Sequence, residues 1–445
     1  SQEAINQKML RLARSGKTVV RLKGGDPTVF GRGGEEAEFL SHYKIPYEFV
    51  PGITSGVAAP IYAGIPVTHR ELASEVTFVT AHEDPRKENS SINWSALAEA
   101  KGTLVVYMGV KTLPLVTQEL LKNGKSPKTP ATLIYRGTFP DQKVLGGDLG
   151  TIAEKARKAR FQAPSIIVIG DVCRLRKKLS WFEEKPLFGK KIIVTRSRKQ
   201  ASVLREKLEE LGAQVVECPV IRIEAPKDCK TLDQSIRQID QFDWIVFTSV
   251  NGVDGFFERF ASLKKDLRSL GSVKIAAIGP ATREALERFQ IFPDVIPKEF
   301  VAESLFQALK KSTSLQGKKF LLARSEEARE FLSDALRKEG AKVQEVVPYE
   351  VRREAASQRL IRETLRTGNV SAITFTSSQI AENFIQMAGK NGLREKLEKT
   401  KIFSIGPITT RKIKSLGLSC DGQAKVYTIP GLVDVIVKTF KRLNV

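Results

Sequence analysis

The sequence contains few of the residues from which metal sites and disulfide frameworks are built. Its 445 residues include only four cysteines and three histidines, and no Cys-x-x-Cys pair occurs. These residues are Cys173, Cys218, Cys229 and Cys420, with His42, His69 and His82. Such scarcity argues against a structural zinc site and against a disulfide framework. We therefore predict no metal, and free thiols in a reducing cytoplasm.

Long apolar runs are also lacking. Apolar residues make up 41% of the chain, but no uninterrupted stretch is long enough to cross a bilayer, so we predict no membrane partner. The chain starts at Ser1 without a charged and then apolar leader, and residues 1–12 have the pattern of an amphipathic helix. We expect a globular protein of two to four domains that begins inside a domain.

Acidic residues are outnumbered. Lys and Arg total 72 against 50 Asp and Glu, a formal net charge of +22. This balance indicates a polyanionic partner, which is nucleic acid, an anionic membrane or a small molecule with many carboxylates or phosphates. The basic residues are spread along the chain and interleaved with Glu, which favours specific anion pockets. A nucleic-acid-binding protein remains an alternative.

The second half of the chain contains three phrases that each occur twice at a nearly constant offset. They are Phe-Thr-Ser at 247–249 and 375–377, Ile-Gly-Pro-x-Thr at 278–282 and 405–409, and Lys-Lys, an apolar run and Arg-Ser at 190–197 and 318–325. The first two phrases follow apolar, strand-like runs and open amphipathic ones. This pattern predicts an α/β folding unit with a parallel sheet, used twice. Gly212 and Gly340 fall where a helix ends.

The Gly-Pro-x-Thr phrase predicts a helix start that attracts anions. Glycine permits the turn, proline takes the first helical position, and the unpaired N–H groups there favour a carboxylate or phosphate. The alternative is that Thr and Ser simply cap their helices. Four such loops in two similar lobes favour a cleft for a long polyanionic ligand.

Residues 1–175 form a separate unit with a glycine-rich loop at 24–36. Predicted strands are 19–23, 47–50, 76–80, 104–108, 131–135 and 165–169. A small-residue helix at 55–64 either packs closely on the sheet or contacts a ligand. His69 is either a buried, satisfied histidine or, with Arg70, a binder of acidic groups.

The runs Arg21–Glu36, Pro51–Ser55, Gly64–Arg70, Tyr107–Gly109 and Gly137–Thr138 resemble the tetrapyrrole methylase family, and within it the uroporphyrinogen-III C-methyltransferases. The resemblance implies a cleft between two α/β lobes in which S-adenosylmethionine is bound by Gly24, Gly25, Asp26, Val29, Thr54, Ser55, Met108 and Gly137. It also implies that Arg32, His69 and Arg70 bind substrate, and that this half is homodimeric. The family opens with a strand, a glycine-rich loop, and an Asp and a Lys that move protons. This sequence starts after them, so it resembles an N-terminally truncated methylase in which methyl transfer is in doubt.

Residues 176–189 are charged, then aromatic, then rich in Pro and Gly, which predicts a linker with one anchored Trp-Phe pair. Residues 190–445 resemble uroporphyrinogen-III synthase through the repeated phrases and Pro348-Tyr349-Glu350. The resemblance implies one lobe from about 186–220 plus 351–445 and a second from about 221–350. Paired strands near 220–223 and 346–351 would form the hinge between them.

Together the two resemblances imply a bifunctional enzyme of sirohaem, cobalamin and haem biosynthesis. The synthase would close hydroxymethylbilane to uroporphyrinogen III through a spiro intermediate, with the last ring inverted and without a cofactor. The methylase would then form precorrin-2. Tyr349 is the candidate proton donor, although a core aromatic in a hinge strand is an equal alternative. Candidate substrate-binding residues are Arg196, Thr248, Ser249, Thr282, Thr376, Ser377 and Thr409. A non-catalytic two-lobed receptor for an anionic small molecule is the remaining alternative.

Overall fold

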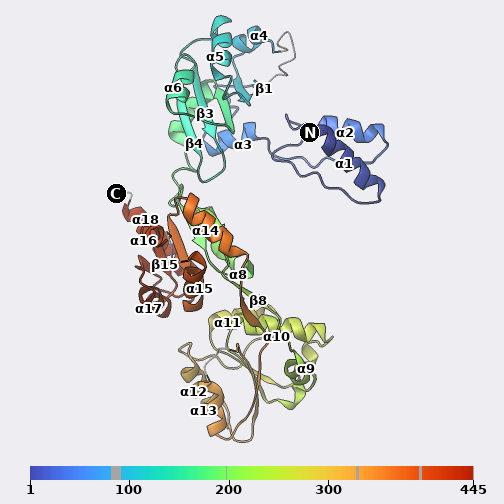
Figure 1. The fold of residues 1–445 in the computed structure, drawn as a ribbon, viewed down its shortest axis with the longest axis vertical. Helices are drawn as coiled ribbons and strands as arrows, with labels where there is room; N and C mark the ends of the chain where they lie inside the picture. The colour runs from blue at the N-terminus through green and yellow to red at the C-terminus, as the bar shows by residue number, and fades with distance from the viewer. Residues whose placement is uncertain (82–91, 197, 327–329, 390–392, 444–445) are drawn as a thin grey trace.

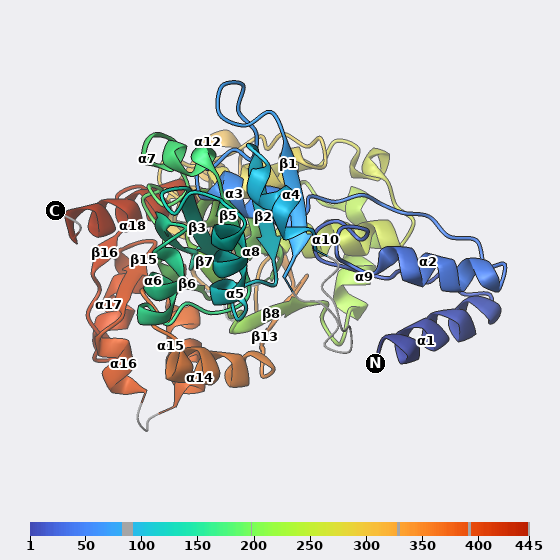
Figure 2. The same ribbon diagram turned by 90° about the horizontal axis from the view of Figure 1, so that it is seen from above.

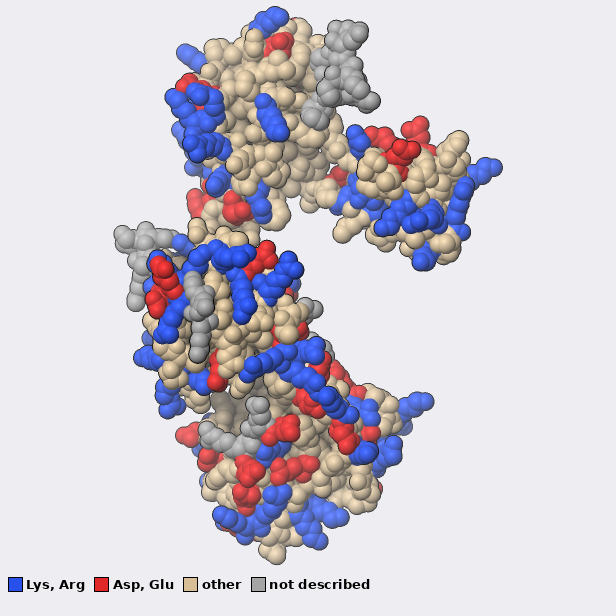
Figure 3. Space-filling model, in the orientation of Figure 1, with Lys and Arg blue, Asp and Glu red and all other residues tan. Residues whose placement is uncertain are grey.

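The computed structural model describes all residues except 82–91, 197, 327–329, 390–392 and 444–445. Ser197, the last residue of one repeated phrase, therefore lies outside the described part. The chain forms an N-terminal unit, followed along the long axis of the molecule by two α/β lobes (Figure 1). Lys and Arg lie on the visible face of every part, and over the two C-terminal lobes they are intermixed with Asp and Glu (Figure 3).

The first 53 residues hold two helices, α1 (Gln2–Arg14) and α2 (Gly33–His42), which stand apart from the sheet that follows (Figures 1 and 2). The strands predicted at 19–23 and 47–50 are wrong, because both segments are extended but belong to no sheet. Val20 is 82% exposed and Val50 80% exposed. The two segments border an open groove of about 1040 Å³, so each lacks the neighbour that a strand requires.

A mixed five-stranded sheet follows, in the order β1-β2-β5-β3-β4, with only β1 and β2 parallel. Its strands are β1 (Val76–Thr80), β2 (Thr103–Tyr107), β3 (Pro130–Tyr135), β4 (Lys143–Asp148) and β5 (Ser165–Ile169). Its helices are α3 (Ser55–Tyr62), α4 (Trp94–Glu99), α5 (Leu113–Lys122) and α6 (Ile152–Lys158). Four predicted strands are confirmed. The fifth, β4, was missed because it lies at the sheet edge and contains two glycines.

The linker is packed on both sides. After η1 (Asp171–Leu175) and α7 (Arg176–Leu179), the Trp181 and Phe182 rings lie 5.1 and 4.8 Å from the ring of Tyr62. Trp181 Nε1 donates to the Ile61 carbonyl at 3.1 Å. On the other side, Phe182 lies 5.3 Å from the Phe188 ring. The predicted Trp-Phe anchor is confirmed: both rings pack on Tyr62 of the N-terminal half, with Phe182 buried (5% exposed) and Trp181 42% exposed.

Two all-parallel sheets make up the rest of the chain. One has the order β16-β15-β14-β6-β7 and the other β10-β9-β11-β12. The strands of the first are β6 (Lys191–Val194), β7 (Gln214–Glu217), β14 (Ala372–Phe375), β15 (Lys401–Ser404) and β16 (Gly422–Gln423). Those of the second are β9 (Trp244–Phe247), β10 (Lys274–Ala277), β11 (Lys319–Ala323) and β12 (Lys342–Val346). We call these parts lobe 1 and lobe 2.

The duplication extends to individual hydrogen bonds. Asp294 Oδ2 accepts from the Ile275 amide at the start of β10, and Asp421 Oδ2 accepts from Ile402 in β15, both at 2.8 Å. Strand order matches as well, since β15-β14-β6-β7 corresponds to β10-β9-β11-β12. The predicted repeat of one α/β unit is confirmed.

Helices cover both faces of each lobe's sheet, because alternate strand residues are buried in separate apolar clusters. In lobe 2, Ile245 and Phe247 face one cluster, and Trp244 and Val246 face the other. The helices of lobe 2 are α9 (Lys230–Arg237), α10 (Val250–Ser262), α11 (Pro280–Glu287), α12 (Ala302–Ser312) and α13 (Phe331–Lys338), with η2 (Ile239–Gln241) and η3 (Leu267–Leu270). Those of lobe 1 are α8 (Arg198–Glu210), α14 (Ser357–Thr367), α15 (Ser378–Ala388), α16 (Arg394–Glu398), α17 (Pro407–Ser415) and α18 (Ile429–Leu443). Both lobes are thus doubly wound, as predicted.

The predicted hinge is an antiparallel pair, β8 (Ile221–Glu224) and β13 (Glu350–Arg353), with Ile221 opposite Arg353 and Glu224 opposite Glu350. Strand β8 follows the carboxyl end of β7 in lobe 1, and β13 follows the carboxyl end of β12 in lobe 2. The carboxyl edges of both sheets therefore face the hinge.

None of the described helices is long and apolar enough to span a membrane. Burial raises the pKa of the Cys218 thiol to about 12, so that thiol stays protonated at neutral pH. In the parts of the chain that the structure describes, no group of His, Cys, Asp and Glu is arranged to hold a metal ion.

Candidate functional site

In the N-terminal half, the glycine-rich loop contacts the loop that precedes α3. A methyl group on Gly52 would lie 2.2 Å from the Gly25 carbonyl oxygen, so only glycine allows this approach. Asp26 accepts hydrogen bonds from the Thr28 hydroxyl and amide at 2.5 and 2.8 Å, and from the Gly52 amide at 3.2 Å. These bonds, led by that of the Thr28 hydroxyl, lower the pKa of Asp26 to about 2. Its carboxylate therefore holds the two loops together.

Tyr107, at the end of β2, joins the second loop to the sheet. Its hydroxyl lies 2.6 Å from Thr54 Oγ1 and accepts from the Gly56 amide at 2.7 Å. The Phe30 ring of the glycine-rich loop lies 4.8 Å from the Tyr107 ring. From the sequence, Tyr107 was identified only as part of a motif, and its role was not predicted. No local pattern indicates that its hydroxyl forms hydrogen bonds with residues about 50 positions away.

Other candidate cofactor-binding residues surround Tyr107. Met108 follows it with a left-handed backbone (φ 54°) and is 52% exposed. Gly137 packs on α3, where a methyl group would lie 2.3 Å from the Ala59 Cβ. The structure thus places Gly25, Asp26, Val29, Thr54, Ser55 and Met108 on contacting segments near Tyr107. Gly24 precedes Gly25 in the same loop, and Gly137 lies against α3. Backbone groups and apolar side chains of this kind suit a nucleoside cofactor.

In the described residues, no hydrogen bond or ion pair links the three candidate substrate-binding residues of this half, Arg32, His69 and Arg70. Arg32 is exposed and occupies the N-cap of α2 with φ 58°. His69 is half-buried, and its Nδ1 accepts from the Glu71 amide at 3.3 Å. Arg70 is exposed, and within the described residues neither arginine forms an ion pair. Both guanidinium groups are therefore available to an anionic ligand.

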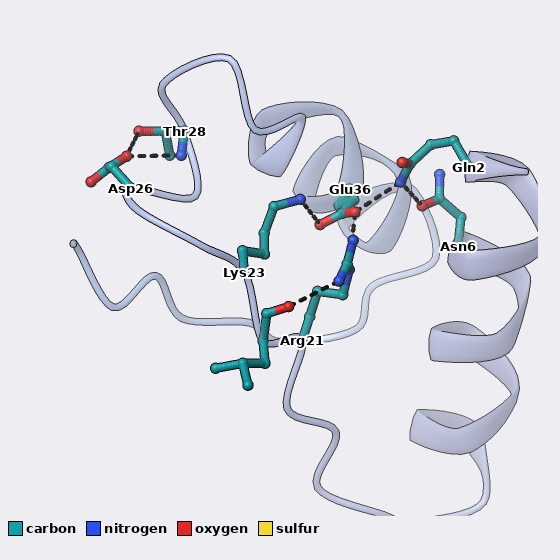
Figure 4. A network of polar contacts seen from close by, with 8 residues as sticks. Gln2, Asn6, Arg21, Lys23, Asp26, Thr28 and Glu36 are labelled. Atoms are coloured by element: carbon teal, nitrogen blue, oxygen red, sulfur yellow. Dashed lines mark hydrogen bonds and ion pairs between the residues drawn. The ribbon is translucent and has the colours of Figure 1, made fainter. Parts of the chain in front are cut away.

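A buried carboxylate organises residues 1–53. Glu36 is 5% exposed and accepts from Gln2 at 2.8 Å, Lys23 at 2.9 Å and Arg21 at 3.2 Å (Figure 4). Burial alone would raise its pKa, but the bonds from Gln2 and Lys23 and the charges of Lys23 and Arg21 lower it overall. This network fixes the extended segment before the glycine-rich loop to both helices.

In the C-terminal half, Tyr349 lies between β12 and the hinge strand β13, only 6% exposed. Its hydroxyl is 3.2 Å from Ser249 Oγ, in the first Phe-Thr-Ser loop. Ser249 also accepts from the Gly252 amide at 3.0 Å. The candidate proton donor therefore contacts one of the candidate anion-binding loops.

The two serines of the repeated phrase are helix caps. Ser249 caps α10, and Ser377 caps α15 by accepting from the Ile380 amide at 3.2 Å. Thr248 Oγ1 donates to the Ala323 carbonyl at 3.4 Å, and Thr376 is half-buried. The capping interpretation is therefore confirmed for the serines.

The threonines of the Gly-Pro loops behave differently. Thr282 and Thr409 are each 4% exposed and cap nothing, and their hydroxyls form no hydrogen bond within the described residues. Pro280 and Pro407 take the first helical position, as predicted. The predicted role of the glycine was wrong, because Gly279 is extended (φ −175°), as any residue can be. A methyl group there would instead lie 3.1 Å from the Phe300 ring.

Arg196 follows β6, the first strand of lobe 1, by two residues. It is half-buried, and burial lowers the pKa of its guanidinium. Its counterpart, Arg324, lies in lobe 2 and pairs with Glu345 at 2.7 Å. Sequence reasoning selected only the first of the two.

A cavity of about 380 Å³ lies beside Tyr349 and α10, but its charge does not suit a polyanion. Its carboxylates are Glu224, Asp254, Glu258 and Glu354, and its guanidinium groups are Arg222 and Arg259. Arg259 is bound by Asp233 at 2.6 Å and Arg222 by Glu224 at 3.0 Å. None of the Gly-Pro loops lines this cavity. The loops instead occupy the carboxyl edges of the sheets.

Family comparisons match each half separately. Residues 1–153 match the model of the tetrapyrrole (corrin/porphyrin) methylases, and residues 202–434 match that of uroporphyrinogen-III synthase HemD. The chain is 37% identical over 384 residues to a porphyrin biosynthesis protein HemD of Ruminiclostridium josui, covering 86% of this chain and 76% of that protein.

The N-terminal half has further relatives. An S-adenosyl-L-methionine-dependent uroporphyrinogen III methyltransferase of Methanosarcina barkeri is 55% identical over 175 residues, which cover 39% of this chain and 69% of that protein. A crystal structure of uroporphyrin-III C-methyl transferase from Thermus thermophilus with S-adenyl homocysteine is 37% identical, with a TM-score of 0.35, covering 39% of this chain and 75% of that one. The chain therefore belongs to the tetrapyrrole methylases through its N-terminal half and to the uroporphyrinogen-III synthases through its C-terminal half, joined in one polypeptide.

Proposed function

We propose that residues 190–445 close hydroxymethylbilane to uroporphyrinogen III with inversion of the last ring, and that residues 1–175 methylate this product with S-adenosylmethionine. The observation that carries the proposal is the presence of both families in one chain, because the product of the first reaction is the substrate of the second. We also propose a linker at 176–189, a lobe 1 of about 186–220 plus 351–445, and a lobe 2 of about 221–350.

Tyr349 is proposed as the proton donor of the synthase. A hydroxyl group leaves as water only when it gains a proton. Because Ser249 Oγ accepts from Gly252, its own proton can point to the oxygen of Tyr349. The phenol proton is then available to the departing hydroxyl. This arrangement needs no strong nucleophile, only a substrate held in the conformation that closes to the correct isomer.

Substrate carboxylates are proposed to bind the repeated loops. The buried hydroxyls of Thr282 and Thr409 and the N-termini of α11 and α17 supply hydrogen-bond donors. The other proposed contacts are Arg196, Thr248, Ser249, Thr376 and Ser377. Since these groups come from both lobes, binding should draw the lobes together about β8 and β13.

In the methylase half, the loops around Tyr107 would hold the cofactor through Gly24, Gly25, Asp26, Val29, Thr54, Ser55, Met108 and Gly137. S-adenosylmethionine would supply a methyl group there for a pyrrole carbon. The chain's own part is to position it, with Asp26 and Tyr107 fixing the loops, while Arg32, His69 and Arg70 bind substrate carboxylates. We further propose a homodimeric methylase half, no cofactor for the synthase, no nucleic-acid partner and a cytoplasmic location.

The test is to incubate the protein with hydroxymethylbilane and separate the uroporphyrinogen isomers. Wild type should form type III, whereas spontaneous closure gives the other isomer. Tyr349→Phe should lower kcat about a hundredfold, within the usual range for loss of a general acid. Tyr135→Phe, in the methylase half, is the matched control. Binding without formation of type III would point to a receptor, and unchanged turnover in Tyr349→Phe would exclude its proposed role.

A further inference from the structure

Two exposed aromatic rings occupy the same place in the two lobes. Phe300 is 58% exposed and Tyr427 is 61% exposed. Phe300 packs on Gly279, where a methyl group would lie 3.1 Å from its ring, and Tyr427 packs on Gly406, where the distance would be 3.4 Å. Each ring therefore covers the glycine of a Gly-Pro loop.

The equivalence is supported by the flanking structure. Phe300 precedes α12 by two residues, and Tyr427 precedes α18 by two residues. Before them, Val295 bridges Ala276 of β10, just as Gly422 pairs with Phe403 of β15. An apolar residue just before a helix cap often packs down onto the helix. Both rings instead remain more than half exposed, so helix packing alone does not account for them.

Both rings lie on the carboxyl edges that face the hinge. In lobe 2 the Gly-Pro loop follows β10, and two strands, β9 and β11, separate β10 from β12, which leads into the hinge. In lobe 1 the loop follows β15, and β14 and β6 separate β15 from β7, which leads into the hinge. At a strand spacing of about 4.8 Å, the loop is roughly 14 Å from the hinge side of the sheet. The rings thus lie on the side of each sheet away from the hinge strand, where they can contact the part of a long ligand that extends beyond the hinge.

Polar groups at the same loops complete the chemistry. Thr282 and Thr409 lie two residues into the helices after Pro280 and Pro407, are 4% exposed, and have hydroxyls without a hydrogen bond in the described residues. Each lobe therefore combines a flat apolar surface with donors for an anion. A pyrrole ring that carries carboxylate arms has the complementary combination.

We propose that Phe300 and Tyr427 bind pyrrole rings of the tetrapyrrole by face contact, one from each lobe, while the adjacent helix N-termini bind carboxylates of the same rings. The inference rests on the proposed synthase function. It assigns to the two residues a positioning role, in which they hold the chain of rings for closure without taking part in bond formation.

The experiment compares Phe300→Ala, Tyr427→Ala and the double variant with Phe292→Ala, a control 72% exposed in the same lobe. Two quantities are measured: KM for hydroxymethylbilane, and the Kd for uroporphyrin III from fluorescence quenching. Each single variant should raise both about tenfold, as loss of one aromatic contact predicts, and the double variant about a hundredfold. The value of kcat should change less than about twofold, and the control should match wild type.

Conservative variants separate ring contact from packing. Phe300→Tyr and Tyr427→Phe should retain wild-type KM and Kd, whereas Phe300→Leu and Tyr427→Leu should not. KM and Kd within about twofold of wild type in both alanine variants would overturn the inference, as would leucine variants that bind like wild type. If the wild-type protein forms no type III isomer, the proposed function is refuted. If the wild type is active but the variants bind like wild type, only the role of the two rings is refuted.

Discussion

Glu36→Gln tests what keeps residues 1–53 folded without a sheet. The carboxylate accepts from Gln2, Lys23 and Arg21 while only 5% exposed. Glutamine preserves the volume and one acceptor oxygen but removes the charge. Lys23, whose side chain is 12% exposed, would then keep an ammonium group without its counterion.

The size of the effect follows from these contacts. A hydrogen bond to a charged group contributes about 1.5–3 kcal/mol, which is our range for the Lys23 contact. Arg21 is 38% exposed and can turn to water, so its pair adds less than about 1 kcal/mol. We expect the local free energy of unfolding to fall by about 3 kcal/mol. Amide hydrogen exchange in α2 should then accelerate roughly a hundredfold.

The pH dependence has a defined sign. Because the folded-state pKa of Glu36 is lowered, its contribution is present above the unfolded pKa of about 4.3. It is lost as the pH falls through the lower folded value. Wild type and Glu36→Gln should therefore differ at neutral pH and converge in acid.

The control is Glu38→Gln, an exposed carboxylate on the same helix. It should leave exchange unchanged at every pH. The reasoning fails if Glu36→Gln accelerates exchange in α2 less than about threefold, or if Glu38→Gln has the same effect.

Four further predictions concern the two halves and their junction. Gly52→Ala places a methyl group 2.2 Å from the Gly25 carbonyl oxygen and should abolish the binding of S-adenosylhomocysteine, measured by calorimetry. Gly34→Ala, which has open space around it, should bind like wild type. Equal affinities of the two variants would contradict the proposed importance of the loop contact. Phe182→Ala should weaken the junction by about 3 kcal/mol and speed proteolysis within 176–189, and unchanged cleavage would show that the ring does not secure it. Ser249→Ala should lower kcat, and the double variant Ser249→Ala/Tyr349→Phe should lose no more activity than Tyr349→Phe alone, because the two hydroxyls share a hydrogen bond. Additive losses of activity would show that the two hydroxyls act independently. Uroporphyrin III should reduce the radius of gyration in X-ray scattering, and a constant radius would exclude closure about the hinge.

The sequence was most informative where a pattern recurs or a strand is buried. The repeated phrases predicted two lobes of one design, and apolar runs such as 165–169 predicted strands, because burial on both faces requires continuous hydrophobicity. The same rule was wrong at 19–23 and 47–50. Their composition suits a strand, but composition does not say whether a hydrogen-bonding neighbour is present.

Long-range contacts were beyond sequence reasoning. Tyr349 meets Ser249 across 100 positions, and Tyr107 meets Thr54 across 53. Both pairs form only because separate strands and loops converge. The family resemblance nominated Tyr349 and the repeated phrase nominated Ser249, but neither could show that the two share a hydrogen bond.

The way lobe 1 is assembled has a consequence for biosynthesis. Its strand β6 bonds to β14, as between Ile193 and Thr374, across 181 positions, whereas every strand of lobe 2 lies within the intervening stretch. On the ribosome, lobe 2 can fold as soon as β12 emerges, while the pair of β6 and β7 waits for β14, the other neighbour of β6. At about 5–20 residues per second, that delay lasts roughly ten seconds or more, during which two apolar strands are open to chaperones and aggregation.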